Sequence, residues 1–248
     1  MADGAFNALA WRYGELWNRS TIGRLQREAV WRRLDRLFRP GDTLLDLGCG
    51  DGEDALHFMS SGMQVHGIDS SPEMVRVACN RGVHATQLAI EELGRLKGSF
   101  DGVISNFGAL NCLRRLDHIR GPVARLIRSG GYLAICLMGR FCLWETAWYL
   151  LRARYRKAFR RWSRHGATSS LGVRVYYPSI RELRGALHPD FSLVRWYGVG
   201  VSIPPSYVTG LSNGLLSQLA GFDRRVEHLP LVRALSDHRL VILARNSA

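Results

Sequence analysis

Residues 44–55 read Leu44-Leu45-Asp46-Leu47-Gly48-Cys49-Gly50-Asp51-Gly52-Glu53-Asp54-Ala55, and this stretch decides the fold. An apolar run ends in an acid, three alternating glycines follow, and a segment with helix-forming character comes next. Glycine permits the tight turn that brings a strand end and a helix start close to a ligand. Asp69 ends the next strand-like run at the spacing of an acid that binds a ribose diol. Together these features predict a site for a nucleoside-containing cofactor.

The acids of this turn separate two classes of cofactor. A dinucleotide fingerprint has a third glycine where this chain has Glu53, and it sets a diphosphate on the helix N-terminus. Asp51, Glu53 and Asp54 would repel that diphosphate. S-adenosylmethionine has no phosphate, and its sulfonium and ammonium groups suit a nearby acid, Asp46 above all. The sequence therefore favours S-adenosylmethionine.

Predicted strands and helices alternate along most of the chain. Residues 6–38 predict two helices broken near Ser20-Thr21, ahead of a stop at Pro40-Gly41. The expected strands are 43–47, 64–68, 85–89, 102–105 and 132–138, with helices at 54–60, 72–80 and 123–128 between them. Strands at 173–177, 192–201 and 239–244 follow, with a helix at 180–187 and helical turns in 213–234. Alternation of this kind predicts a parallel sheet covered by helices on both faces.

Residues 141–165 depart from this alternation. The segment contains no glycine or proline, and its apolar face carries Trp144, Trp148, Leu151, Tyr155, Phe159 and Trp162, while arginines occupy much of the rest. We expect one long basic amphipathic helix. It can roof a substrate pocket, pack on the sheet as core, or lie on an anionic membrane. We expect Glu145 on its solvated flank, with a place facing the active site as the alternative.

Four motifs occur in the order and spacing of a known family. They are Leu44–Gly52, Ile68–Met74, Phe100–Asn106 and Arg128–Leu133. In these motifs the chain resembles the class I S-adenosylmethionine-dependent methyltransferases. The resemblance implies a doubly wound, Rossmann-like α/β fold with a seven-stranded sheet of order 3-2-1-4-5-7-6. It also implies an N-terminal helical cap and a helical insert after strand 5.

The resemblance also assigns residues to the cofactor site. Gly48, Cys49 and Gly50 would wrap the methionine part, near Asp46. Asp69 and Ser70 would contact the ribose, and Met74 would flank the adenine. Ala89 stands where the family often has an acid for the adenine amine, so Ile90 would pack on adenine, and Glu91 either supplies the carboxylate or lies on a helix surface. Asn106 would contact cofactor or substrate, and Tyr13 is a lid contact or a packing residue.

The acceptor is harder to infer. Phe107 and Asn111 follow the fourth strand, at the edge where ligands bind in such sheets. Trp144 and Trp148 from the insert, with Tyr177 and Tyr207, would add apolar walls to a substrate pocket. No residue is assigned a catalytic role, because positioning can suffice for methyl transfer. His118, His165, His188 and His238 lack a partner spacing and are expected at surface or structural positions.

Composition bounds the remaining choices. The 248 residues suit one domain, which we divide into a helical cap (1–39), a cofactor core (40–139), a lid or insert (140–172) and C-terminal strands and helices (173–248). Five scattered cysteines predict neither a disulfide framework nor a metal site. The net charge of +13 fits an anionic partner, although the arginine bias behind it can also reflect genome composition.

These observations predict a cytoplasmic enzyme that methylates a small or medium-sized, hydrophobic metabolite, as in secondary metabolism. One alternative is a membrane-associated lipid or quinone methyltransferase, peripheral at the membrane. Another is an RNA-binding protein or RNA methyltransferase on the same scaffold. Nucleic acid is disfavoured because Ser105-Asn106-Phe107-Gly108 lacks the prolines that hold a flipped base.

Overall fold

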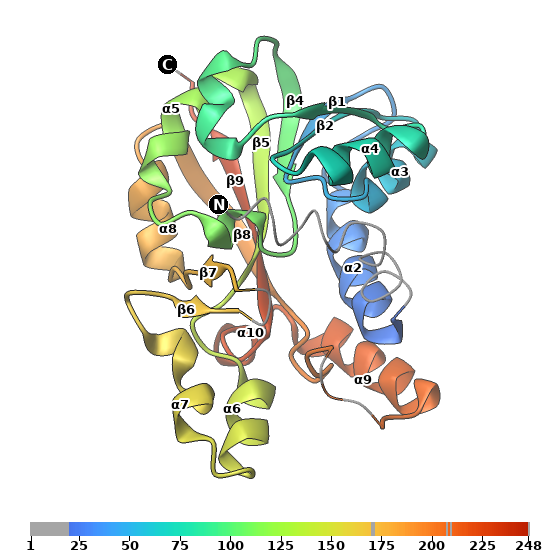
Figure 1. Ribbon diagram of the computed structural model, residues 1–248. Helices are drawn as coiled ribbons and strands as arrows, with labels where there is room; N and C mark the ends of the chain where they lie inside the picture. The colour runs from blue at the N-terminus through green and yellow to red at the C-terminus, as the bar shows by residue number, and fades with distance from the viewer. Residues whose placement is uncertain (1–19, 170–171, 207, 209, 248) are drawn as a thin grey trace.

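The computed structural model describes residues 20–169, 172–206, 208 and 210–247, and within them a seven-stranded sheet forms the centre of the molecule (Figure 1). Its order is β3-β2-β1-β4-β5-β9-β8, as predicted. Strands β1 to β5 run parallel, and β9 runs antiparallel to both of its neighbours. The strands are β1 (Thr43–Leu47), β2 (Gln64–Asp69), β3 (His84–Gln87), β4 (Phe100–Ser105), β5 (Ile127–Met138), β8 (Phe191–Val199) and β9 (His238–Arg245).

Helices cover both faces of this sheet (Figure 1). One buried apolar cluster joins the sheet to α2 (Thr21–Leu34), α3 (Glu53–Ser60) and α4 (Pro72–Asn80). The other joins it to α5 (Asp117–Leu126), α8 (Ile180–Leu187) and the short 3₁₀ helices η2 (Ile90–Arg95) and η3 (Ala109–Cys112). This is the doubly wound arrangement that the alternation predicts.

Local sequence explains where several helices begin. The side chains of Ser20, Ser71, Ser179 and Ser212 each accept a hydrogen bond from a backbone N–H in the first turn of the helix that follows. At α8, Glu182 also accepts from the backbone of Ser179, which completes a capping box. Helices α4 and α8 therefore match their predicted bounds. The helix expected over 123–128 is displaced, because α5 starts at Asp117 and residues 127–128 belong to β5.

The single helix expected over 141–165 is wrong. The segment forms a hairpin of α6 (Leu143–Leu150) and α7 (Tyr155–Ala158), and the 3₁₀ helix η4 (Arg160–Trp162) follows. In the connection, Ala153 has a φ of 54°. Buried Glu145 of α6 accepts hydrogen bonds from Arg160 at 2.7 and 2.9 Å and from Arg161 at 2.8 Å. A buried ion cluster thus folds the segment back on itself, and Glu145 does not lie on a solvated flank.

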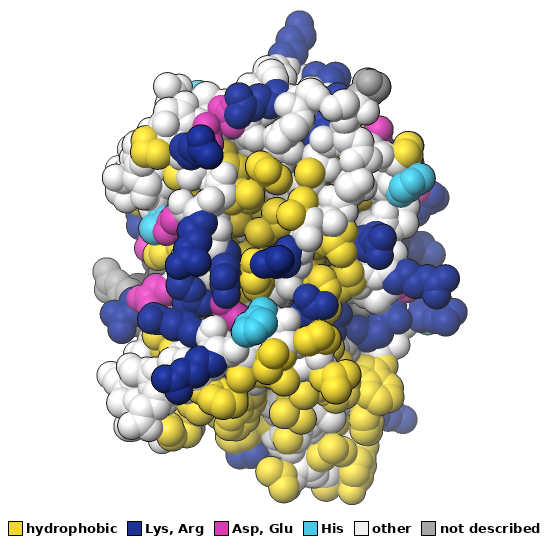
Figure 2. All heavy atoms as spheres, turned by 180° about the vertical axis from the view of Figure 1, so that it is seen from behind, with side chains coloured by type: hydrophobic (Ala, Val, Ile, Leu, Met, Phe, Trp, Pro, Cys, Tyr) yellow, Lys and Arg dark blue, Asp and Glu magenta, His cyan; other side chains and the backbone are white. Residues whose placement is uncertain are grey.

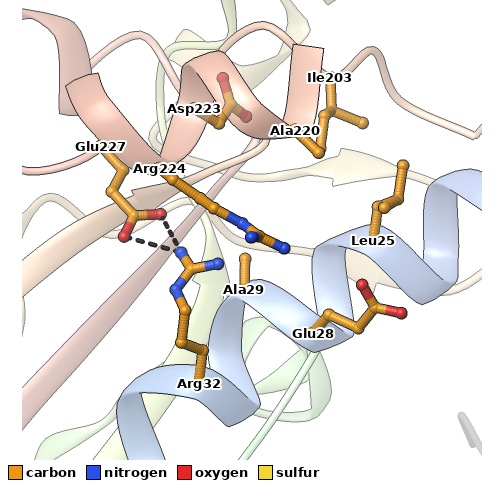
Figure 3. A pocket seen from close by; sticks show the side chains of 9 residues that line it. All are labelled: Leu25, Glu28, Ala29, Arg32, Ile203, Ala220, Asp223, Arg224 and Glu227. Atoms are coloured by element: carbon orange, nitrogen blue, oxygen red, sulfur yellow. Dashed lines mark hydrogen bonds and ion pairs between the residues drawn. The ribbon is translucent and has the colours of Figure 1, made fainter. Parts of the chain in front are cut away.

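Two other segments complete the described structure. The strand expected over 173–177 shortens to β7 (Arg174–Val175), which pairs with β6 (Ala167–Thr168) in a separate two-stranded sheet. Helices α9 (Asn213–Val226) and α10 (Pro230–Arg233) fall within the predicted helical turns. Just after α9, Glu227 accepts from Arg32 of α2 at 2.8 and 2.9 Å, which attaches α9 to α2 (Figure 3). Within the described ranges, no helix combines the length and the apolar character that crossing a membrane requires.

We predict that Glu145→Gln destabilises the fold by about 3 kcal/mol, because the change leaves buried Arg161 with part of its counter-charge removed. Glu145 is 1% exposed. The control is Glu28→Gln. Glu28 forms an exposed pair with Arg24 at 3.8 Å, and its change should alter stability by less than about 0.5 kcal/mol. Urea unfolding measures both variants. Equal stabilities would show that the cluster does not hold the hairpin.

Candidate active site

The glycine turn after β1 has a backbone that only glycine adopts readily. Gly48 has a φ of 72°, and a Cβ atom there would lie 2.3 Å from the Cβ of Ala109. Gly50 has a φ of 55°, yet a Cβ built there would meet no atom of the described residues within 4 Å. The turn is therefore closed against η3 on one side and open on the other. The open side leaves room for a ligand to approach the backbone.

Asp69 links this turn to the start of α4. Its Oδ2 accepts a hydrogen bond from the N–H of Gly50 at 2.9 Å, and its Oδ1 accepts from the N–H of Ser71 at 2.9 Å. A carboxylate has about four acceptor positions, so these bonds are compatible with the predicted ribose contact. Asp69 therefore has a structural function in addition to the one that the sequence predicts.

Arginines neutralise the acids that follow the turn. Arg81 pairs with Asp51 at 3.3 Å and with Glu53 at 2.6 Å. Asp54 pairs with buried Arg27 at 2.5 Å. The sequence argument counted these acids against a diphosphate ligand, but their charges are compensated locally. That part of the argument is weaker than expected.

Asp46 is different, because its carboxylate is buried beside the turn without full compensation. It is 1% exposed, and its Oδ2 has no hydrogen-bond partner among the described residues. Burial raises the pKa of Asp46 well above its usual range, and the nearby Asp54 and Asp69 raise it further, while Arg27 lowers it. A buried acid of this kind is stabilised by a ligand that brings positive charge. S-adenosylmethionine fits this requirement.

The other predicted cofactor residues gather at the same edge of the sheet. Asn106 directly follows the last residue of β4, and both polar atoms of its buried amide lack a partner in the described structure. Cys49, Met74 and Ile90 are buried, and Ser70 and Ala89 are half-buried. All of them lie at or just beyond the carboxyl ends of β1 to β4. Tyr13 and Tyr207 lie outside the described residues.

A cleft of about 290 Å³ opens beside η3 and α8. Its walls include Leu113, Arg114, Leu116, Arg140, Arg164, Tyr176, Tyr177, Pro178 and Glu182. Of the predicted substrate residues, Tyr177 lines this cleft. Burial raises the pKa of Tyr177, although Arg160 and Arg161 oppose the effect. Its hydroxyl therefore stays protonated at neutral pH and is suited to hydrogen bonding or packing.

The remaining predicted substrate residues have other contacts. Asn111 is a structural clamp, because its amide donates to the carbonyls of Met138 at 3.2 Å and Tyr176 at 2.7 Å and accepts from the N–H of Met138 at 2.9 Å. Trp144 donates to the carbonyl of Ser202 at 2.8 Å. The Trp148 ring stacks under Arg152 at 3.4 Å. The structure therefore does not bring these three side chains into the cleft.

The sequence places His238 at a surface or structural position, and the structure buries it beside Asp237 at the start of β9. The Nδ1 of His238 lies 3.2 Å from the Oδ2 of Asp237, and the imidazole ring packs edge-on against Phe107 at 5.4 Å. Arg161 donates to Asp237 at 2.6 Å. Burial alone would raise the pKa of Asp237, but His238 and Arg161 outweigh it and hold that pKa well below its usual range. In the sequence, the adjacency of Asp237 and His238 was the signal for this pair. Its position at the edge of the sheet follows only from the fold.

A second cavity lies between α2 and α9, lined by Leu25, Ala29, Arg32, Ile203 and Glu227 among others (Figure 3). Its volume is about 10 Å³. That volume holds about one water molecule, so the cavity is too small for an acceptor. The cleft beside η3 is the better candidate for the acceptor.

The doubly wound fold and the residues around the glycine turn are those of an enzyme that binds a nucleoside-containing cofactor. Comparison with known proteins identifies the family. Residues 38–169 match the family described as a methyltransferase domain. The chain therefore belongs to this family: it is a class I S-adenosylmethionine-dependent methyltransferase. The predictions of the fold, the enzyme class and the methyl donor are confirmed.

Individual relatives are more distant. Uncharacterized protein MJ1252 of Methanocaldococcus jannaschii is 24% identical over 81% of this chain and 80% of its own length. Demethylmenaquinone methyltransferase of Tropheryma whipplei is 31% identical over 52% of this chain and 56% of its own. Ubiquinone biosynthesis O-methyltransferase of Xanthomonas oryzae is 30% identical over 42% and 46%. The chain thus spans about half the length of these two named enzymes.

Among solved structures, a methyltransferase in complex with the Trm112 methyltransferase activator of Haloferax volcanii has a TM-score of 0.66 at 18% identity, over 100% of this chain and 99% of that one. Magnesium protoporphyrin IX methyltransferase of Synechocystis has a TM-score of 0.59 at 15% identity, over 98% and 97%. At these identities the likeness concerns the fold alone.

We predict that Asp69→Ala weakens the binding of S-adenosylmethionine by roughly 1–3 kcal/mol, the scale of a lost charge-assisted hydrogen bond. The variant also releases the N–H of Gly50 from its acceptor. Glu92→Ala is the control, because Glu92 is an exposed acid paired with Arg95. Isothermal titration calorimetry measures both affinities. An unchanged affinity for Asp69→Ala would remove this residue from the site.

The burial of Asp46 leads to a separate prediction, which concerns the release of a proton when the cofactor binds. Because its pKa is raised in the free protein, a cationic ligand nearby should favour the ionised form and drive a proton into solution. We expect cofactor affinity to rise with pH until Asp46 ionises in the free protein. Calorimetry in two buffers with different ionisation enthalpies detects the released proton. Asp46→Asn should abolish the buffer dependence, and binding heats of the unmodified chain that are equal in the two buffers at every pH tested would contradict the contact.

Proposed function

We propose that the chain transfers a methyl group from S-adenosylmethionine to a small or medium-sized, hydrophobic metabolite. The observation that carries the proposal is the cleft of about 290 Å³ beside η3. Its volume is close to the lower end of the range for small-molecule sites, about 300–1,000 Å³. Leu113, Leu116, Pro178 and the two tyrosines give it apolar and aromatic walls, and charged groups also line it: Arg114, Arg115, Asp117, Arg140, Arg164 and Glu182. A metabolite with one or two rings matches this space.

The position of the cleft supports the same proposal. Its wall residues Leu113 and Arg114 directly follow η3, whose Ala109 lies against Gly48 of the cofactor turn. Arg140 follows the carboxyl end of β5. The cleft therefore opens at the edge of the sheet where the cofactor residues gather. When bound, S-adenosylmethionine supplies the activated methyl carbon, and the chain supplies alignment and exclusion of water.

Proton removal is assigned to no residue of the cleft. His238 is buried at the start of β9 and packs against Phe107 on the sheet face that carries α2, whereas Leu113, Leu116 and Ala186 of the cleft belong to the face that carries α5 and α8. Asp237 lies 3.2 Å from its Nδ1, and that nitrogen makes no hydrogen bond in the described structure. Positioning can suffice for methyl transfer, and an acceptor that is already ionised needs no base.

A membrane-associated enzyme acting on a lipid or quinone is the second candidate. The observation in its favour is the apolar surface of the hairpin α6–α7, where Leu151 is 86% exposed and Tyr155 is 63% exposed. The two named relatives described above act in menaquinone and ubiquinone formation by their names. The cofactor chemistry is the same in both candidates, which differ in how the acceptor arrives.

We predict that Tyr177→Leu raises the KM for the acceptor by about tenfold while cofactor affinity stays unchanged, because the change removes one polar group from the wall of the cleft. The assay follows S-adenosylhomocysteine release with a panel of phenols, quinols, aromatic acids and amines. Tyr155→Leu is the control, since Tyr155 lies on the exposed hairpin. Methylation of RNA or protein, with none of the panel accepted, would refute the proposal.

A further inference from the structure

The hairpin α6–α7 carries an unusual amount of exposed apolar surface. Figure 1 shows it projecting below the sheet with its connection at the far end, and Figure 2 shows apolar side chains gathered in the lower part of the molecule. Leu151 in the connection is 86% exposed. Exposed large apolar side chains of the hairpin also include Leu143, Leu150, Tyr155, Phe159 and Trp162, each between 38% and 63% exposed. An apolar surface of this kind marks a docking site.

The charge of the hairpin is almost entirely positive. Glu145 is the only acid in residues 141–165, and it is buried between Arg160 and Arg161. The exposed cations are Arg152, Arg154, Arg156, Lys157 and Arg164. Leucine and aromatic side chains thus alternate with arginines on the same exposed element. That combination fits a surface with negative headgroups over an apolar interior.

Buried contacts also hold the base of the hairpin against the rest of the protein. Arg161 joins Glu145 at 2.8 Å to Asp237 at 2.6 Å, so α6, η4 and the start of β9 are held together by buried charges. The N–H of Leu143 also donates to the carbonyl of Leu235 at 3.0 Å. The exposed tip therefore extends from a part of the hairpin that buried ion pairs and a hydrogen bond attach to the sheet. Because α6 begins just after β5 ends at Met138, the hairpin leaves the sheet at the edge that holds the cofactor turn.

We propose that the α6–α7 hairpin inserts its tip, from Leu150 to Tyr155, into the interface of an anionic lipid bilayer. The arginines beside the tip contact the headgroups, and the leucines enter the boundary of the acyl chains. Leu151 decides between a bilayer and RNA, because an aliphatic side chain contributes little to phosphate or base contacts. This inference extends the second candidate function, but it concerns attachment and does not depend on which acceptor is methylated.

Vesicle co-sedimentation tests the proposal with the full chain and no acceptor. We expect binding to vesicles of phosphatidylcholine with 30% phosphatidylglycerol, and much weaker binding to pure phosphatidylcholine or in high salt. Leu151→Asp should reduce partitioning by about tenfold or more. Val194→Asp is the matched control, because Val194 is 55% exposed on the edge strand β8, in the half away from His238. Circular dichroism verifies that both variants fold.

A second pair of variants tests the charges. Arg154→Gln with Arg156→Gln should weaken binding to the anionic vesicles, whereas Arg181→Gln with Arg184→Gln, equally exposed on α8, should not. Loss of binding in the first pair with none in Leu151→Asp would overturn insertion and leave electrostatic attraction alone. A dimer in light scattering that Leu151→Asp abolishes would overturn the proposal in favour of a second copy. Failure of every vesicle test would leave the proposed methyl transfer untouched, since cofactor binding is measured separately.

Discussion

The carboxylate of Asp69 is the constraint on which the cofactor site depends. The Asp69 side chain accepts hydrogen bonds from the N–H of Gly50 and the N–H of Ser71, so it joins the turn after β1 to the start of α4. The same segments are also joined by the parallel pairing of β1 and β2 and by hydrogen bonds from the N–H groups of Gly48 and Cys49 to the carbonyl of Ile68. The glycine turn needs such a tie, because its left-handed residues cost conformational entropy when ordered. A residue suited to the ligand thus also shapes the backbone that receives the ligand.

Electrostatic compensation then determines which charge is left for the ligand. Asp51, Glu53 and Asp54 each have an arginine partner, so the net field of the turn is smaller than a count of acids suggests. Asp46 has the deepest burial of the four and keeps an oxygen without a partner in the described structure. A lone buried carboxylate is costly unless it is neutralised by a proton or a cation. The preference for a cationic cofactor therefore depends on Asp46 much more than on the acids after the turn.

Local signals account for most of what could be predicted. The glycine turn, the serine caps and the alternation of strands and helices are encoded within a few residues, so helices such as α4 follow from them. The sheet order came from the family resemblance. The hairpin could not be predicted in this way. No glycine or proline marks its bend, and the fold-back depends on Glu145 meeting Arg160 and Arg161 once all three are buried. The surroundings of His238 could not be predicted for the same reason, because Phe107 beside its ring and Arg161 beside Asp237 come from distant parts of the chain.

The buried ion cluster of Arg161, Glu145 and Asp237 connects the hairpin α6–α7 to the sheet. Asp237 accepts from Arg161 of the hairpin and lies beside His238 at the edge of the sheet, and its second oxygen also accepts from Gln26 of α2 at 3.4 Å. Movement of the hairpin against the sheet would therefore separate buried opposite charges, which is costly in a low-dielectric interior. The buried ion pairs therefore fix the orientation of the base of the hairpin relative to the carboxyl edge of the sheet, where the cofactor residues lie.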